Sequence, residues 1–243
     1  MHAPRERIVP GAQTAVVFIH GIVSTPRFWD DFTAALPQDV SFINLLLPGH
    51  GGTVRDFSRV RRGAWRQHVH EALLRMKKTH AQVYLVGHSM GALLSILEAA
   101  DEPEGIAGLM LMATPLRIRV KPSAMLSNML KGIGLMESRE ELAKYYGTEQ
   151  DWRVWRYIGW IPRYLELFSL SRQAREALPR LRIPARAFQH GRDELVSPRS
   201  GKLLLAHPAV SLQTLHASGH HDIASDDRQQ LLAALREMLP ENP

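Results

Sequence analysis

The sequence of 243 residues contains no cysteine. This absence excludes disulfide bonds, thiolate metal sites and a cysteine nucleophile. The sequence also has no apolar run long enough to cross a membrane, and its charged first residues, 1–7, lack the apolar centre of a signal peptide. We therefore expect a cytoplasmic protein without an integral membrane segment.

The sequence has fewer acidic than basic residues. Lys and Arg number 30 against 24 Asp and Glu, which gives a formal net charge of +6. Basic residues gather at 55–66 and at 172–186, but no nucleic-acid-binding module is visible around them. We therefore place these charges on solvated helix faces and loops and expect no nucleic-acid partner. A modest attraction to anionic substrates or membrane surfaces stays open.

One short segment carries more functional information than the rest of the chain. The apolar run 82–87 is typical of a buried strand, and the pattern from residue 90 onward is typical of a buried helix. Between them, Gly87, Ser89 and Gly91 form a Gly-x-Ser-x-Gly motif, in which a sharp turn presents the serine hydroxyl. Such a serine is a candidate nucleophile if a base and two oxyanion donors lie beside it.

The donors for an oxyanion are expected at two turns. The continuous apolar run 14–19 predicts a buried strand, which leads through a His-Gly pair into a helix predicted at 27–36. The turn between them typically supplies the first backbone N–H donor, which we assign to Ile22, and the residue after the nucleophile, Met90, supplies the second. We interpret His20 in this turn as a structural, hydrogen-bonded histidine.

The acid of a catalytic triad is expected at the end of a strand, on the same sheet edge as the serine. The strand predicted at 184–190 is followed by a Gly-x-Asp loop that contains Asp193. We assign the acid to Asp193, with the neighbouring Glu194 as the competitor.

The base is expected after the last strand, which is predicted at 210–215 and leads to two adjacent histidines. We favour His220, because a loop tip after Gly219 places it first in the cleft. His221 is the competitor and is expected to begin the final helix, predicted at 223–239. The resulting order of serine, acid and histidine matches one of the three known triad orders.

Strands and helices alternate along most of the chain. Six strands are predicted, at 14–19, 41–46, 82–87, 106–112, 184–190 and 210–215. Helices are predicted at 27–36, 63–79, 90–100, 198–206 and 223–239. This alternation predicts an α/β fold with a mainly parallel sheet flanked by helices. The alternation fails at 115–182, which we interpret as a helical cap inserted after the fourth predicted strand, so that 1–114 and 183–243 form the core.

The predicted cap is rich in large apolar side chains. Met129 belongs to one apolar group, while Trp152 and Trp155 belong to a second group that holds three of the five tryptophans of the chain. Most of these residues are expected to pack the cap itself. Together they exceed what a small cap needs to bury, so we expect some of them, with Met129, Trp152 and Trp155 as candidates, to line an apolar acyl pocket over the serine.

The motifs together resemble those of the α/β-hydrolase superfamily, in particular its bacterial carboxylesterases and monoacylglycerol lipases, over the range 16–239. Residues 47–51, Leu-Pro-Gly-His-Gly, are similar to the Pro-Gly-His-Gly loop of that family, with Trp65 in the helix that follows. Residues 218–220, Ser-Gly-His, are similar to its Ser-x-His motif. The resemblance implies a serine esterase for small carboxylic esters of short to medium acyl chain, with monoacylglycerols among the candidates.

The expected mechanism passes through an acyl-enzyme intermediate. His220 takes the proton of Ser89 during attack on the ester carbonyl, Asp193 orients the imidazole, and water then cleaves the acyl-enzyme. Neither a metal nor an organic cofactor is required. The serine argues against haloalkane dehalogenase chemistry, which uses aspartate at that position. An amidase, thioesterase or aminopeptidase would use the same residues, and a ligand receptor built on this fold is the alternative from another class.

Overall fold

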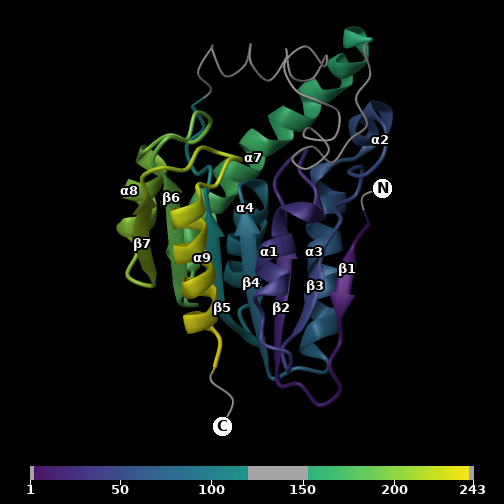
Figure 1. Cartoon of the computed structure of the whole chain (residues 1–243). Coiled ribbons are helices and arrows are strands. Elements are labelled where there is room, and N and C mark those ends of the chain that lie inside the picture. Colours follow the sequence, from purple (N-terminus) through teal and green to yellow (C-terminus); the bar gives the residue numbers. More distant parts are fainter. Residues whose placement is uncertain (1–2, 120–152, 241–243) are drawn as a thin grey trace.

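A central sheet organises the structure, a computed structural model that describes residues 3–119 and 153–240 (Figure 1). Its strands are β1 (Arg5–Arg7), β2 (Thr14–Ile19), β3 (Ser41–Asn44), β4 (Gln82–His88), β5 (Ile106–Met112), β6 (Ala185–His190) and β7 (Val210–Leu215). Within the described part, they form one sheet in the order β1-β3-β2-β4-β5-β6-β7. β1 is antiparallel to β3, and every other neighbouring pair is parallel.

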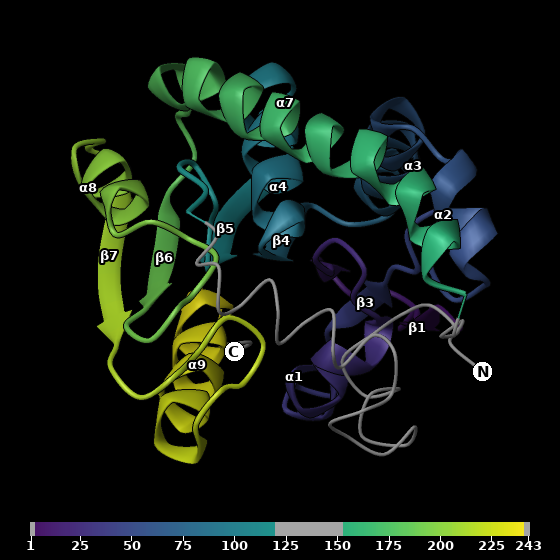
Figure 2. The same ribbon diagram turned by 90° about the horizontal axis from the view of Figure 1, so that it is seen from above.

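Helices cover both faces of the sheet, as the view from above shows (Figure 2). One face carries α3 (Arg62–Lys77), α4 (Met90–Asp101), α7 (Ile161–Ala177) and α8 (Arg199–Leu205). The opposite face carries α1 (Asp30–Ala34) and α9 (Ser225–Met238). Short helices lie in the connections: η1 (Pro26–Trp29), α2 (Val54–Arg59), η2 (Val154–Trp160) and η3 (Leu178–Arg180).

The alternation of side chains along β2 explains this layering. Successive residues of a strand point to opposite faces of the sheet. Ala15, Val17 and Ile19 belong to the core beneath α3, α4 and α7. Val16 and Phe18 belong to the core beneath α1 and α9. Because both faces are covered, every residue of β2 is buried, and the strand forms a nearly continuous apolar run in the sequence.

The sheet confirms the predicted fold class, since each of the six predicted strands corresponds to an observed one. The sequence pattern does not predict β1, whose three residues are largely exposed, or α2, which is shorter than two helical turns. The helical segment predicted at 27–36 consists of η1 and α1 and ends at Ala34. The prediction that His221 begins the final helix is wrong, because α9 begins at Ser225 and His221 lies in the preceding loop.

The predicted cap, 115–182, is described only in part. Residues 120–152 lie outside the described residues, so the boundaries 1–114, 115–182 and 183–243 stay a prediction. α7 falls within the predicted cap range, and it contacts α4. Its buried residues Leu167, Leu170 and Ala174 join the core on that face of the sheet.

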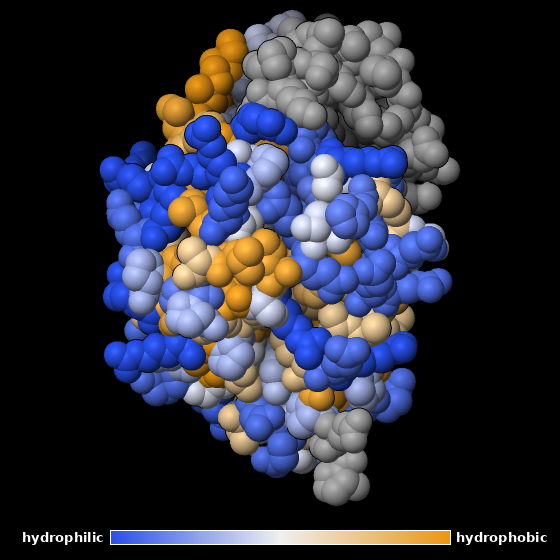
Figure 3. Space-filling view, turned by 90° about the vertical axis from the view of Figure 1, so that its left-hand side faces the viewer, coloured by the Kyte–Doolittle hydropathy of each residue, from blue (hydrophilic) through white to orange (hydrophobic). Residues whose placement is uncertain are grey.

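The outer face of η2 and α7 is apolar and exposed. Trp155 and Ile158 of η2 are exposed, and so are Ile161, Leu165 and Phe168 of α7. In Figure 3, which views the molecule from the left-hand side of Figure 1, apolar side chains, in orange, gather at the upper left. Among the helices of residues 3–119 and 153–240, none combines the length and the apolar character that spanning a membrane requires.

Two leucines of α7 test how this helix packs. Leu170 is 0% exposed and Leu165 is 62% exposed. We expect Leu170→Ala to lower the free energy of unfolding by about 2–5 kcal/mol, because it removes buried methyl groups and leaves a cavity. The matched control Leu165→Ala should change it by less than about 0.5 kcal/mol. Urea unfolding followed by circular dichroism measures both, and equal effects would contradict the packing of α7 on α4.

Candidate active site

The turn between β4 and α4 holds Ser89 in a conformation that few residues adopt. Ser89 has a φ of 52° and a ψ of −117°, and a positive φ is strained for a residue that carries a side chain. Its N–H donates to the carbonyl oxygen of Met112 at the end of β5 (2.9 Å), and its carbonyl oxygen accepts from the N–H of Ala92 (3.0 Å). These bonds fix the strained turn to the neighbouring strand and to α4.

The two glycines of the Gly-x-Ser-x-Gly motif leave no room for a side chain. A Cβ on Gly87 would lie 2.5 Å from the carbonyl oxygen of Gly91. A Cβ on Gly91 would lie 2.0 Å from the carbonyl oxygen of Ile19, at the end of β2. Both obstacles are backbone atoms, so only glycine permits this close approach. The spacing of the motif therefore follows from the crossing of the turn over β2.

Ser89, His220 and Asp193 meet beyond the ends of β4, β6 and β7. Nε2 of His220 lies 3.0 Å from Oγ of Ser89, and Nδ1 of His220 lies 2.8 Å from Oδ2 of Asp193. All three residues are buried. With the imidazole neutral, Nδ1–H donates to the carboxylate and Nε2 accepts from the serine hydroxyl. The three side chains thus form one continuous hydrogen-bonded chain.

Asp193 is held as a carboxylate. Burial by itself raises its pKa, but the charge interaction and the hydrogen bond with His220 lower it. The N–H groups of Val196 and Leu195 lower it further, since each donates to Oδ1 at 2.8 Å. The net result is a pKa below the ordinary value of aspartate. Asp193 can therefore orient the imidazole and stabilise its charged form without taking the proton itself.

The two competing residues lie beside this chain of hydrogen bonds. Oε2 of Glu194 accepts from the backbone N–H of His220 at 3.3 Å, so this carboxylate supports the loop and not the imidazole. The ring of His221 lies perpendicular to that of His220, with centroids 4.7 Å apart. The geometry therefore brings Asp193 and His220 together with Ser89.

Ile22 and Met90 lie at the two turns next to Ser89. Met90 is the first residue of α4. Gly21, which precedes Ile22, is so close to the elbow that a Cβ on it would lie 3.1 Å from Cβ of Ser89. Among the described residues, nothing accepts a hydrogen bond from the backbone N–H of Ile22 or of Met90. Two unused donors beside a serine are the groups that an oxyanion requires.

Two histidines that sequence reasoning missed hold the loop of His220. Nε2 of His88 lies 2.9 Å from the carbonyl oxygen of His220, and Nδ1 of His190 lies 2.7 Å from that of Gly219. Burial holds the pKa of His88 well below its ordinary value and also lowers the pKa of His190. Both rings are therefore neutral at pH 7, and each donates one N–H to the loop. Their only signal in the sequence is position: His88 lies within the serine motif, and His190 directly precedes the Gly-x-Asp loop.

The same loop is fixed to α9 on its other side. Oγ of Ser218 donates to Oδ2 of Asp227 (2.7 Å) and accepts from the N–H of Ala224 (3.1 Å). The N–H of Ala217 donates to the same carboxylate oxygen of Asp227 (3.1 Å). The serine of the Ser-Gly-His segment therefore positions the histidine that follows it.

The residues expected to line an acyl pocket are described only in part. Trp155 lies on η2, where it is exposed. Met129 and Trp152 lie outside the described residues. The assignment of all three to a substrate pocket stays a prediction.

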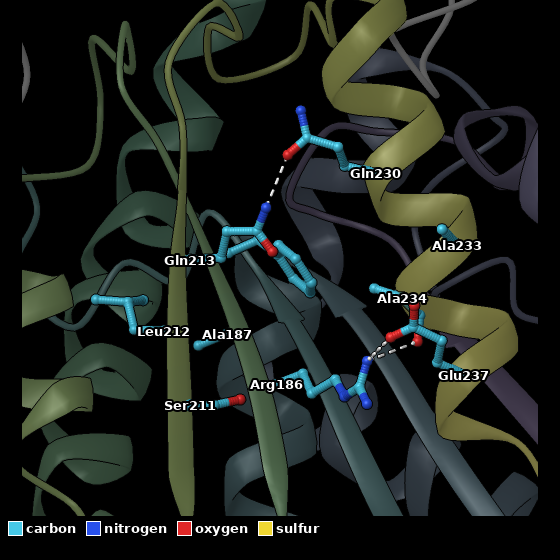
Figure 4. A pocket seen from close by; sticks show the side chains of 10 residues that line it. Arg186, Ala187, Ser211, Leu212, Gln213, Gln230, Ala233, Ala234 and Glu237 are labelled. Atoms are coloured by element: carbon cyan, nitrogen blue, oxygen red, sulfur yellow. Dashed lines mark hydrogen bonds and ion pairs between the residues drawn. The ribbon is translucent and has the colours of Figure 1, made fainter.

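A cavity of about 520 Å³ lies elsewhere, between β6, β7 and α9 (Figure 4). Four of its polar side chains bind one another in pairs: Arg186 forms an ion pair with Glu237 (2.8 Å), and Gln213 donates to Gln230 (2.7 Å). Arg186 is near the start of β6, whereas Asp193 follows the end of that strand. The cavity is therefore separate from the hydrogen-bonded chain around Ser89.

A comparison of the sequence with models of known protein families agrees with the fold and with the arrangement around Ser89. The model of the alpha/beta hydrolase family matches residues 16–235. The chain belongs to the alpha/beta hydrolase family.

Similar proteins include lipolytic enzymes. The structure reported for LipS and LipT, two metagenome-derived lipolytic enzymes, matches with a TM-score of 0.72 and 22% identity over 97% of this chain and 96% of that chain. Monoacylglycerol lipase abhd6-A of Xenopus laevis is 28% identical over 110 residues, which are 42% of this chain and 31% of that protein. Family and fold together support a hydrolase activity.

A second curated relative has a different activity in its name. The chain is 33% identical over 98 residues to the 2-succinyl-6-hydroxy-2,4-cyclohexadiene-1-carboxylate synthase of Enterobacter sp. (strain 638). That match covers 39% of this chain and 35% of the synthase. The matches therefore span about a third of the length of both curated relatives.

Buried neutral histidines make the stability of the fold sensitive to acid. His50 lies in the loop after β3, and burial lowers its pKa from 6.5 to about 4, although hydrogen bonds to the carbonyls of Pro48 and Leu47 raise it. Between these two pH values the unfolded chain binds a proton that the folded chain does not. The free energy of unfolding therefore falls as the pH decreases from 6.5 to about 4. At about 1.4 kcal/mol for each pKa unit, His50 contributes roughly 3 kcal/mol to this fall.

We expect His50→Gln to flatten the dependence of unfolding free energy on pH, because it removes one of the groups responsible. His216→Gln is the matched control, since His216 is exposed, and it should leave the slope as in the parent. Urea unfolding at a series of pH values from about 7 to about 4 measures the slope. The same slope in the parent and in His50→Gln would contradict a depressed pKa at this position.

Proposed function

We propose that this protein is a serine hydrolase that cleaves carboxylic esters. The observation that carries the proposal is the chain from Ser89 through His220 to Asp193, with contacts of 3.0 and 2.8 Å. A hydroxyl, a base oriented by a carboxylate, and unused N–H groups beside the hydroxyl are the parts that acyl transfer requires. Membership in the alpha/beta hydrolase family supports the same chemistry.

In the proposed mechanism, Nε2 of His220 takes the proton as Oγ of Ser89 attacks the ester carbonyl carbon. Asp193 stabilises the imidazolium that forms. The N–H groups of Ile22 and Met90 bind the negative charge on the carbonyl oxygen, and the position of Met90 at the start of α4 adds the favourable field of the helix dipole. His220 then gives its proton to the leaving alcohol, and water cleaves the acyl-enzyme by the same steps. None of these steps uses a metal or an organic cofactor.

The proposed substrates are small esters with short to medium acyl chains, with monoacylglycerols among the candidates. The names of a lipolytic structural neighbour and of a monoacylglycerol lipase relative support this class. We propose that Met129, Trp152 and Trp155 contribute to the acyl pocket. Amides and thioesters could react through the same residues, so the test of substrate class is to compare turnover of p-nitrophenyl esters of graded chain length with turnover of the matching p-nitroanilide and thioester.

We expect Ser89→Ala to lower ester turnover by at least about 1,000-fold, because the members of a triad act as a unit. A serine-reactive fluorophosphonate should label the parent and not this variant. Ser95→Ala is the control: this serine lies on α4, the helix that follows Ser89, and is buried, with its hydroxyl donating to the carbonyl oxygen of Gly91 (2.9 Å). The Ser95→Ala variant should still be labelled. Labelling of the Ser89→Ala variant at another serine would refute the assignment of the nucleophile.

The adjacent histidines give a second test. We expect His220→Ala to lose as much turnover as Ser89→Ala, because base and nucleophile depend on each other. His221→Ala should keep most of the activity. Initial rates on the preferred p-nitrophenyl ester, with circular dichroism to establish folding, distinguish the two. A greater loss in His221→Ala would move the base to His221.

A further inference from the structure

The loop after β3 contains a buried histidine that the proposed mechanism does not use. His50 is 6% exposed and belongs to the Leu-Pro-Gly-His-Gly segment, residues 47–51. The ring of His50 lies edge-on to those of His20 and Phe57, with centroids 4.8 and 5.1 Å away. A buried imidazole requires hydrogen-bond partners, and the partners of His50 indicate its role.

Both ring nitrogens of His50 have backbone partners. Nδ1 lies 3.2 Å from the carbonyl oxygens of Leu47 and Pro48, so it carries the ring proton and donates it. Nε2 then accepts from the backbone N–H of Val23 at 2.9 Å. Because burial lowers the pKa of His50 to about 4, the ring is neutral at pH 7 and Nε2 keeps its lone pair.

Val23 is the third residue of a tight turn, residues 21–24, which follows β2. The N–H of Ser24 donates to the carbonyl oxygen of Gly21 (3.2 Å) and closes this turn. Val23 has a φ of 58°. At this position a type II turn normally requires glycine or asparagine, and a β-branched residue with positive φ is an outlier. Some contact outside the turn must therefore stabilise the conformation.

The hydrogen bond to His50 is such a contact. A turn with positive φ at its third residue differs from the commoner type I turn by a rotation of about 180° of the central peptide. Here that peptide joins Ile22 to Val23, and its N–H donates to Nε2 of His50. Loss of the acceptor would allow Val23 to relax to negative φ, with a rearrangement of the turn that also carries the N–H of Ile22.

We propose that His50 is a positioning residue for the oxyanion turn: by accepting the N–H of Val23, it keeps residues 21–24 in the conformation that leaves the N–H of Ile22 available to the reacting carbonyl oxygen. This role rests on the proposed function. His50 itself contacts no reacting atom, and its effect passes through the turn.

His50 is well placed to hold the turn because its own position is fixed. The N–H of Leu47 donates to Nε2 of His20 (3.1 Å), and Nε1–H of Trp65 donates to the carbonyl oxygen of Pro48 (3.0 Å). Phe57 packs between His50 and Trp160 of η2, with its ring centroid 4.9 Å from that of Trp160. Contacts with α2, α3 and η2 thus fix the position of the Pro-Gly-His-Gly segment, and His50 in this segment binds the turn.

Three single variants separate hydrogen bonding from packing. His50→Leu retains an apolar side chain but removes the acceptor. His50→Gln provides an amide oxygen as acceptor and an N–H as donor. His80→Leu is the control, since His80 is also buried, at 5% exposure, and its Nδ1 bonds the carbonyl oxygen of Met76 at the far end of α3.

Hydrogen exchange tests the bond without reference to activity. We expect the amide of Val23 to exchange slowly in the parent, in His50→Gln and in His80→Leu. We expect exchange at this amide to be at least about tenfold faster in His50→Leu. Rapid exchange of the Val23 amide in the parent would overturn the proposal, and this arm remains decisive even if His50→Leu does not fold.

Kinetics with a transition-state mimic test the consequence for the oxyanion. Oγ of Ser89 adds to the carbonyl carbon of a trifluoromethyl ketone, its proton passes to Nε2 of His220, and the ketone oxygen becomes an oxyanion. Loss of one oxyanion donor typically costs about 100-fold or more in kcat. We expect His50→Leu to lower kcat/KM on esters and to raise the inhibition constant of the ketone by the same factor, about 100-fold, with KM changed less than about threefold. A loss of active protein alone would lower kcat and leave the inhibition constant unchanged, which would overturn the proposal.

A second substitution tests the role of strain in the turn. Glycine adopts positive φ without penalty. The double variant His50→Leu, Val23→Gly should therefore have a kcat/KM at least about tenfold higher than that of His50→Leu alone. The single variant His50→Gln should exceed His50→Leu by a similar factor. No recovery in either variant would show that His50 acts only by packing. If the parent itself shows no hydrolysis that depends on Ser89, the proposed function fails, and the exchange of the Val23 amide still decides whether His50 holds the turn.

Discussion

The backbone of the serine turn crosses the end of β2 at a separation that leaves no space for a side chain. A Cβ on Gly91 would lie 2.0 Å from the carbonyl oxygen of Ile19, and the rest of the site is arranged around this contact. β2 and β4 are neighbouring parallel strands, so the turns that follow them emerge side by side. The crossing therefore brings Ser89 next to both candidate oxyanion donors, Ile22 and Met90. A wider crossing would separate the serine from the turn after β2.

Neutral histidines hold the loops around this crossing. His88 and His190 each donate an N–H to the loop of His220, and His50 accepts an N–H from the turn after β2. A neutral imidazole suits these positions because one of its ring nitrogens can donate, as in His88 and His190, and the other can accept, as in His50. Their low pKa values also have an electrostatic consequence. A charged His88 or His190 would oppose the imidazolium that the proposed mechanism forms on His220, and burial keeps both neutral.

α7 and η2 lie between the core that supports the site and the exposed apolar side chains of the surface. The inner face of α7 belongs to the core of the sheet, whereas its outer face presents Leu165 and Phe168 to the surface. Trp160 at the end of η2 donates Nε1–H to the carbonyl oxygen of Val54 (3.0 Å) and packs on Phe57. Through Phe57, the packing that begins at η2 reaches His50, which binds the turn at residues 21–24. The region expected to select the substrate therefore contacts the elements that are proposed to perform the chemistry.

Local patterns in the sequence determined the strands, the fold class and the candidate residues Ser89 and Asp193, because the apolar runs of strands buried on both faces and the sterics of a turn involve residues close in the chain. β1 and α2 were too short to produce such a pattern. Only the tertiary structure decided that His220, and not His221, reaches Ser89, since this depends on how Ser218 binds α9. It alone also revealed the hydrogen bonds of His50 to Val23 and of His88 to His220. Their partners lie 27 and 132 residues away, and the order of the strands, which no local pattern encodes, brings them into contact.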